Sequence, residues 1–209
     1  MISADEFLPY DRPNLSKDYL AGTAPEEWIP LRSTDFYREQ EIDLLTNTSV
    51  TAIDPKARRM ALSDRRSLGY GALLLATGAD PVRLEIPGGG LPHVCYLRTL
   101  ADSRRIIDKA KDAKRAVVIG ASFIGLEVAA SLRERKVEVE VVGKGPLPLE
   151  KVLGHELGNL IRETHEAHGV RFHLGRTPAA IRNRQVQLDD GTILDCDLVV
   201  VGIGVRPNT

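Results

Sequence analysis

Cysteine is scarce in this 209-residue sequence, which contains only two. Cys95 and Cys196 lie far apart, so a CxxC redox pair and a zinc knuckle are excluded. A disulfide between them stays open, although free, packed thiols in a reducing cytosol are the simpler interpretation. The His165/His168 pair has no nearby thiolate or third ligand, so we expect no metal site.

The sequence also lacks an excess of charge of one sign and any long apolar run. Its 28 basic and 29 acidic residues give a net charge of -1, which argues against nucleic acid as a partner. No stretch approaches the roughly 18 apolar residues of a membrane helix. The N-terminus has neither the basic nor the apolar region of a signal peptide. We therefore expect a cytoplasmic protein without nucleic acid or membrane partners.

The two halves of the chain differ in regularity. The pattern of the first half predicts two short helices and then three strands: helices 17–21 and 34–41, strands 50–53, 59–63 and 70–76. The last of these strands is a continuous apolar run, so we expect it to be buried. The second half alternates helices with strands: helices 99–111, 123–135 and 152–168, strands 116–119, 137–142, 170–174 and 198–201, and a hairpin turn at 189–191. This alternation predicts an α/β fold with a doubly wound parallel sheet.

A tight turn between a predicted strand and a predicted helix has the pattern of a dinucleotide-binding site. Such a turn needs a glycine at its bend, a small residue where the pyrophosphate approaches, and a third small residue for packing. Gly120 and Gly125 meet the first and third needs, and Ser122 stands at the second, where its hydroxyl can donate to a phosphate. The helix start at Phe123 and Ile124 offers unpaired N–H groups. A purely structural turn is the alternative.

Five segments of the chain resemble motifs of the FAD-dependent ferredoxin, rubredoxin and putidaredoxin reductases. They are residues 9–17 (PYDRPNLSK, against PYDRPPLSK), 75–79 (LATGA, against LATG), 96–99 (YLRT), 119–127 (IGASFIGLE, against IGGGFIGLE) and 201–208 (VGIGVRPN). These reductases, with the apoptosis-inducing-factor-like flavoproteins, are a branch of the pyridine nucleotide-disulfide oxidoreductase superfamily. The segments keep the family's order over nearly the whole chain.

The resemblance implies an enzyme that passes electrons from NAD(P)H through FAD to an iron–sulfur carrier of the ferredoxin or rubredoxin type. It implies a partial FAD-binding domain with a β-meander at 1–99, an NAD(P)-binding domain at 100–205, and the start of a return to the FAD domain at 206–209. The family's first strand and glycine turn, which bind the FAD pyrophosphate, have no match here, so we expect an internal piece that binds FAD poorly. The alternatives are a nucleotide-binding module without turnover, or a flavoprotein of the apoptosis-inducing-factor type without metabolic turnover.

The resemblance also implies a catalytic pair. Lys17 lies near the reactive edge of the flavin in this comparison and pairs with Glu127, which follows the glycine turn. A carboxylate in the first turn of a helix is favoured by the helix dipole, and a buried lysine needs a partner. The alternative is a solvated surface lysine and an unrelated helix carboxylate.

Further residues are carried over as flavin contacts. Arg12 corresponds to an arginine near the flavin diphosphate, with an ion pair to Asp11 or Asp18 as the alternative. Pro13 would shape the loop along the flavin. Asp5 would hydrogen-bond the ribose of FAD, with a solvated loop acid as the alternative.

The remaining expected cofactor residues stand at strand ends or close to one. Glycine and small residues there let the backbone approach a cofactor closely, with simple turn glycines as the alternative. Arg98 would reach the flavin, unless it is a solvent arginine at the helix start. These residues are Ala76, Thr77, Gly78 and Arg98 for the flavin and Gly202 and Gly204 for the nicotinamide.

The second strand of the predicted nucleotide-binding unit ends without the acid that NAD-preferring sites carry. Gly143 stands at that position and Lys144 follows it, whereas Glu140 lies along the strand. Because the acid that repels a 2′-phosphate is missing, we expect NADPH to bind at least as well as NADH. The alternative is a surface turn without a role in binding.

Overall fold

The computed structural model describes residues 1–208, and the chain forms two compact units. Unit 1 comprises residues 1–11 and 27–77, and unit 2 comprises residues 12–26 and the chain from Gly78 onward. These limits differ from the expected division at residue 99, since residues 12–26 and 78–99 pack within unit 2. Thr209, the last residue of the expected segment 206–209, lies outside the described residues.

A five-stranded parallel sheet is the centre of unit 2, which confirms the expected α/β fold. Its strands, in spatial order, are β5 (Val94–Tyr96), β12 (Leu198–Val201), β6 (Arg115–Ile119), β7 (Glu138–Gly143) and β8 (Val170–Leu174). Strands β8 and β12 have the predicted bounds. The edge strand β5 was not predicted, because a three-residue run beside a glycine-rich segment gives too little periodicity to identify.

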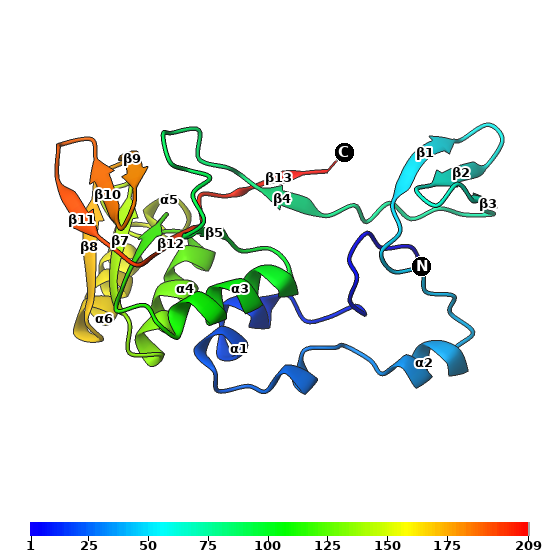
Figure 1. Ribbon diagram of the computed structural model, residues 1–209, viewed down its shortest axis with the longest axis horizontal. Coiled ribbons are helices and arrows are strands. Elements are labelled where there is room, and N and C mark those ends of the chain that lie inside the picture. The colour runs from blue at the N-terminus through cyan, green and yellow to red at the C-terminus, as the bar shows by residue number, and fades with distance from the viewer. Residues whose placement is uncertain (209) are drawn as a thin grey trace. The chain divides into compact units, whose positions relative to one another are not determined.

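Two helices that pack on the parallel strands are α3 (Leu100–Ala110) and α4 (Phe123–Glu134), shown in green in Figure 1. Helix α3 begins with a capping box between Thr99 and Asp102, which fixes its first turn. The predicted helix 152–168 is wrong as a single element. It is divided into α5 (Glu150–Leu153) and α6 (His155–Ala167), because Gly154 takes a φ of 84° that a helix cannot contain.

A three-stranded antiparallel sheet packs on the parallel strands through a shared apolar core. It consists of β9 (Pro178–Arg182), β10 (Gln185–Leu188) and β11 (Ile193–Asp195), with the predicted turn at 189–191 between the last two. Ile181, Val186 and Leu188 join Val117 and Val199 in that core, all of them nearly inaccessible to solvent. The short strands β4 (Ala79–Pro81) and β13 (Val205–Pro207) pair separately.

The N-terminal part of unit 2 is a short segment fixed to the helices by buried serines. It contains η1 (Pro13–Ser16) and α1 (Asp18–Ala21). Ser103 donates to the carbonyl of Leu15 at 2.9 Å, and Ser131 donates to the carbonyl of Ser16 at 2.7 Å. These bonds satisfy backbone carbonyls that would otherwise be buried without a partner.

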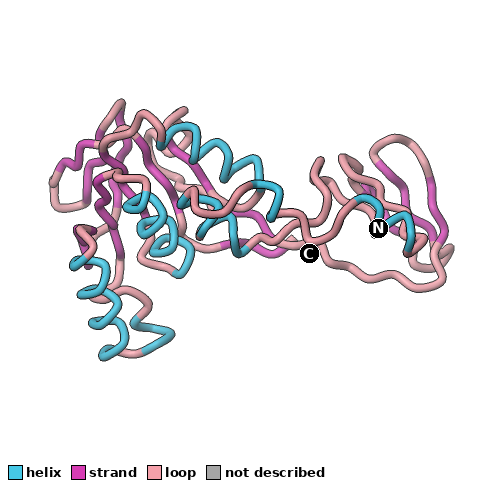
Figure 2. The backbone as a smooth tube through the Cα atoms, turned by 90° about the horizontal axis from the view of Figure 1, so that it is seen from below, coloured by secondary structure: helices cyan, strands magenta, loops and turns pink. Residues whose placement is uncertain are grey.

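Unit 1 is mostly loop, as Figure 2 shows, around a three-stranded antiparallel meander. The meander, which was expected, consists of β1 (Val50–Asp54), β2 (Arg59–Leu62) and β3 (Ser67–Gly69); the helical pieces are η2 (Glu26–Trp28), where the chain enters the unit, and α2 (Thr34–Glu39). Ser33 caps α2, since its side chain accepts from the N–H of Phe36.

The predicted buried strand at 70–76 is wrong. Residues 72–76 form no strand, and Leu74 and Leu75 are 88% and 63% exposed. An apolar run forms a strand only where a neighbouring strand supplies hydrogen bonds, and none of the strands described in residues 1–208 pairs with it. Within the same described residues, no helix is long and apolar enough to cross a membrane.

Both thiols are free and buried in unit 2. Burial raises the pKa of each, and the neighbouring carboxylates of Asp197 and Asp195 help to raise the pKa of Cys196 to about 12. Cys95 and Cys196 are 2% and 1% exposed. The reactive thiolate is therefore nearly absent at mildly alkaline pH.

We expect the folded chain to leave an aromatic disulfide reagent almost unreacted, whereas the chain in denaturant releases two equivalents of chromophore. The measurement is the time course of absorbance under both conditions. Rapid reaction of either thiol in the folded chain would contradict the buried placement.

Candidate functional site

The glycine turn of residues 120–125 lies between the end of β6 and the start of α4. Gly120 takes a φ of 115°, which favours glycine, and its N–H donates to the carbonyl of Val142 at 2.8 Å. Ser122 is the N-cap of α4, accepting from the N–H of Gly125 at 3.3 Å. Its hydroxyl donates to the carbonyl of Gly202 at 2.7 Å, so donation to a phosphate would require this bond to break.

Three glycines bring two turns from distant parts of the sequence into direct contact. A Cβ at Gly125 would lie 1.9 Å from the carbonyl oxygen of Gly120, and a Cβ at Gly120 would lie 2.3 Å from that of Gly202. A Cβ at Gly202 would lie 3.3 Å from the nitrogen of Gly125. Glycine at position 125 therefore lets the turn after β6 close on itself, and glycine at position 120 lets that turn approach the turn after β12.

A cavity of about 650 Å³ opens beside these turns. It is lined by residues at the carboxyl ends of β6, β7 and β12 and by the loop after β8, and these include Gly120, Ser122, Lys144, Arg176, Gly202 and Gly204. The carboxyl edge of a parallel sheet is where open α/β folds bind their ligands, and the volume is that of a small-molecule site.

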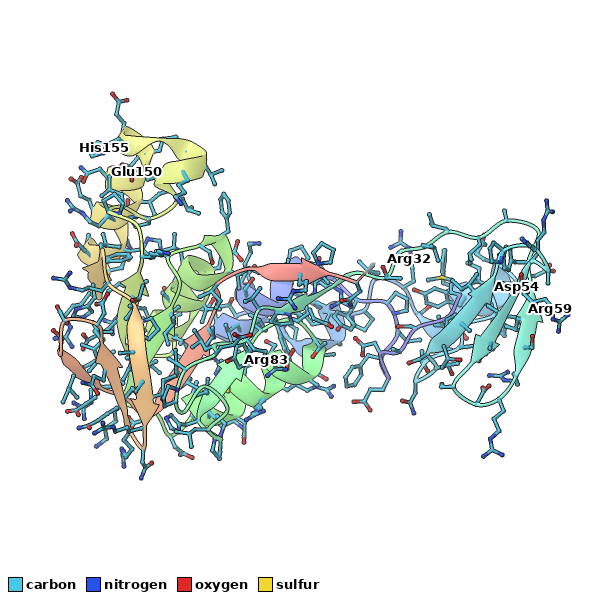
Figure 3. All side chains as sticks on the ribbon, turned by 90° about the horizontal axis from the view of Figure 1, so that it is seen from above. Arg32, Asp54, Arg59, Arg83, Glu150 and His155 are labelled. Carbon is cyan, nitrogen blue, oxygen red and sulfur yellow. The ribbon has the colours of Figure 1, made fainter. Side chains whose placement is uncertain are left out.

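The rim of the cavity carries more positive than negative charge. Lys144, Lys151 and Arg176 line it together with one acid, Glu150. The carboxylate of Glu150 contacts Nδ1 of His155 at 3.2 Å, and Figure 3 shows these two side chains next to each other on the α5–α6 segment. The cavity therefore suits an anionic ligand.

Strand β7 ends at Gly143 without an acid, as the sequence indicates. A Cβ there would lie 2.9 Å from the Cβ of Ala121 and 3.1 Å from Cδ2 of Leu174. Glu140, which was expected along the strand, contacts His173 at 2.6 Å and so is occupied within the sheet. A side chain at position 143 would collide with its neighbours unless they moved.

The predicted pairing of Lys17 with Glu127 is confirmed. Lys17 Nζ lies 3.2 Å from Glu127 Oε1, with side chains 48% and 29% exposed. Sequence reasoning missed the third member, Ser16, whose hydroxyl donates to Glu127 Oε2 at 2.6 Å. Its place directly before Lys17 in the matched segment was the signal that could have identified it.

Four of the matched segments meet elsewhere in unit 2. Arg12 Nη1 donates to the carbonyl of Arg98 at 2.9 Å, and a Cβ at Gly78 would lie 3.7 Å from Nη2 of Arg98. The N–H of Asn208 donates to the carbonyl of Gly78 at 3.0 Å. Residues from the PYDRP, LATG, YLRT and VRPN segments are thus neighbours, and Pro13 begins η1 beside Arg12.

The other expected flavin residues lie in unit 1. Asp5 accepts from the Tyr10 hydroxyl at 2.6 Å and from the N–H of Phe7 at 3.3 Å, so its carboxylate is held within the loop. Ala76 and Thr77 are exposed and do not end a strand, which corrects the expected local structure.

Sequence reasoning also missed Ala121, Glu150, Lys151 and Arg176 as cavity residues. Arg176 follows β8, and β8 lies beside β7 in the sheet. The parallel order of these strands places their carboxyl ends together, so this residue could have been found by extending the sheet argument by one strand.

Comparison with known proteins agrees with this geometry. The family model for pyridine nucleotide-disulphide oxidoreductases matches residues 1–209. The chain belongs to this family. This confirms the resemblance carried by the five sequence segments.

Relatives within the family include named electron-transfer reductases. The ferredoxin–NAD(+) reductase component of the anthranilate 1,2-dioxygenase system of Burkholderia cepacia is 39% identical over 100% of this chain and 52% of its own length. The crystal structure of the ferredoxin reductase for the CYP199A2 system of Rhodopseudomonas palustris has a TM-score of 0.94 and 39% identity, covering 99% of this chain and 52% of that one.

A second solved structure, the covalent putidaredoxin reductase–putidaredoxin complex, also has a TM-score of 0.94, at 36% identity over 99% of this chain and 52% of that chain. The chain thus spans about half the length of the relatives it matches.

The serine anchor beneath the Lys17 segment gives one prediction. Because Ser131 is buried, Ser131→Ala leaves the carbonyl of Ser16 without its hydrogen bond, which should lower the free energy of unfolding by about 1–3 kcal/mol. Urea denaturation measures it. Glu134→Ala, an exposed change on the same helix, should stay within about 0.5 kcal/mol of the wild type. Equal stability of the two variants would contradict the anchor.

The close packing within the turn after β6 gives another prediction. Gly125→Ala places a methyl group against the carbonyl oxygen of Gly120, and overpacking of this kind should cost about 1–3 kcal/mol of unfolding free energy. Gly90→Ala is the matched control, because a Cβ there meets nothing within 4 Å. The midpoint of thermal unfolding should fall for the first variant and hold for the second; a shift in neither would contradict the geometry.

Proposed function

We propose that unit 2 binds the nicotinamide coenzyme of an FAD-dependent reductase that passes electrons from NAD(P)H to a ferredoxin- or rubredoxin-type carrier. The observation that carries the proposal is the pair of glycine turns, after β6 and β12, that lines the cavity at the carboxyl edge of the sheet. The names of the related reductases support the choice of acceptor class.

The residues present fit a dinucleotide. The amides of Phe123 and Ile124 precede the first hydrogen bond of α4, which runs from Leu126 to Ser122, and are therefore open to a pyrophosphate at the positive end of the helix. Gly120 permits the sharp bend of the turn, and Gly125 lets the start of α4 pack closely against it. Gly202 and Gly204 would pass close to the nicotinamide.

The flavin contacts proposed for unit 2 are Arg12, Pro13, Lys17, Gly78, Arg98 and Glu127, and those proposed for unit 1 are Asp5, Ala76 and Thr77. Bound FAD would supply the conversion of two-electron transfer into single-electron transfer. Lys17 and Glu127 are the proposed catalytic pair, because together they hold a fixed charge beside the reacting rings. Ser16 positions Glu127 through its 2.6 Å hydrogen bond.

The two thiols support an external electron acceptor. Cys95 and Cys196 are free and buried, so neither forms a dithiol that could take electrons from a flavin. Free thiols are also typical of reducing compartments, which supports the expected cytoplasmic location as part of this proposal.

The proposal is tested by titrating NADH and NADPH into the chain and by recording the spectrum with added FAD. We expect saturable coenzyme binding, together with weak FAD binding that does not survive gel filtration. With excess FAD, the chain should speed the bleaching of flavin absorbance by the coenzyme. Gly125→Ala should lose this effect and Gly90→Ala should keep it. A chain that binds neither coenzyme would overturn the proposal, and stoichiometric FAD after gel filtration would contradict the expected weak affinity.

A further inference from the structure

We propose that the cavity of unit 2 holds the 2′-phosphate of NADPH between Lys144 and Arg176, so that NADPH is bound in preference to NADH. The inference rests on the proposed function, because it concerns the same coenzyme site. It goes further in naming the coenzyme, the residues that select it, and a steric reason for the selection.

The first support is that position 143 has no room for an acid. An acid at the end of the second strand normally accepts a hydrogen bond from the ribose 2′-hydroxyl and repels a 2′-phosphate. Here the methyl group of Ala121 lies 2.9 Å from where a Cβ at Gly143 would stand. Ala121 itself replaces a glycine of the IGGGFIGLE motif. The methyl group of Ala121 therefore occupies the space that a side chain at position 143 would need.

The second support is that Lys144 and Arg176 lie on two loops that are hydrogen-bonded to each other. The N–H of Arg176 donates to the carbonyl of Gly143 at 3.1 Å, and the N–H of Gly175 donates to the carbonyl of Gly145 at 3.0 Å. These bonds hold the loop after β8 against the loop after β7. Lys144 and Arg176 then line one cavity from two sides of this junction.

The third support is the state of each charged group. Lys144 is exposed, and no partner of its ammonium group is found among residues 1–208. Arg176 is held by Asp190 through Nε at 2.7 Å, and its Nη1 donates to the carbonyl of Gly175 at 3.4 Å, so Nη2 is the guanidinium nitrogen left for a ligand. Lys151 adds a third cation to the lining, and Glu150, the one acid, is engaged with His155. A dianionic phosphate suits this balance better than a ribose hydroxyl.

The first test is calorimetric titration of the whole chain with NADPH, NADH, adenosine 2′,5′-bisphosphate and 5′-AMP. Lys144→Ala should weaken NADPH and the bisphosphate about tenfold, the value of a hydrogen bond to a charged group, while NADH and 5′-AMP change little. Arg176→Ala should act in the same direction. Lys114→Ala, an exposed change on the same unit outside the cavity lining, is the matched control and should bind all four ligands as the wild type does.

The second test exchanges the volume between positions 121 and 143. Gly143→Glu alone should weaken both coenzymes, because its Cβ meets Ala121. The double variant Ala121→Gly/Gly143→Glu removes that methyl group and should bind NADH in preference to NADPH. Ala121→Gly alone should keep the wild-type preference, since the cations are unchanged, and thermal unfolding checks that each variant is folded.

The outcomes separate the inference from the function beneath it. If the wild type binds NADH more tightly than NADPH, or if Lys144→Ala weakens both coenzymes equally, the inference is overturned and the proposed function stands. If the wild type binds none of the four ligands, both are overturned. A NADPH preference that falls with rising salt, while NADH affinity holds, supports the phosphate contact, because salt screens exposed charges.

Discussion

The contact between the turns after β6 and β12 is the constraint on which the site depends. The parallel pairing of these strands brings Gly202 beside the start of α4. At that point the backbone of Gly120, the backbone of Gly125 and the carbonyl of Gly202 occupy a space in which added Cβ atoms at 120 and 125 would collide. The hydroxyl of Ser122 then joins the two turns by its hydrogen bond to Gly202. A glycine at position 122 would leave this carbonyl without that donor. The serine therefore links the two turns, although its side chain takes up space where a pyrophosphate would approach the backbone.

A second set of contacts, made by buried serines, fixes the position of the Lys17–Glu127 ion pair. Ser131 on α4 and Ser103 on α3 fix the carbonyls of η1, so the segment that carries Lys17 cannot slide along the helices. Glu127 stands one helical turn before Ser131, and it receives both Lys17 and the hydroxyl of Ser16. The ion pair is partly exposed and contributes little stability by itself. Its position is set by the buried serine bonds rather than by its own attraction.

Local patterns were enough to predict the unit from β6 through α4 to β7. The strands and the helix are recognised by their hydrophobic patterns and the turn by its glycines, and these elements follow one another directly in the sequence. Patterns failed where neighbours decide. Residues 72–76 and β12 both consist of aliphatic residues alone. However, β12 has β5 and β6 on its two sides, whereas the earlier run has no strand beside it among the described residues. The helix over 152–168 failed for a local reason, since Gly154 adopts a left-handed φ of 84° that periodicity does not reveal.

The same distinction applies to the site. Lys17 and Glu127 were predicted from matched motifs, whereas Arg176 lies outside every motif and is placed by the pairing of β8 with β7. The sequence shows that a glycine, and not an acid, stands at position 143, but it does not show the reason. The structure supplies the reason in Ala121, 22 positions earlier, whose methyl group fills the space that a side chain at 143 would need. The two departures from the family pattern compensate for each other in volume. The loss of the acid is therefore part of the packing at the end of β7, and an acid cannot return by one substitution without removing that methyl group or moving the turn that holds it.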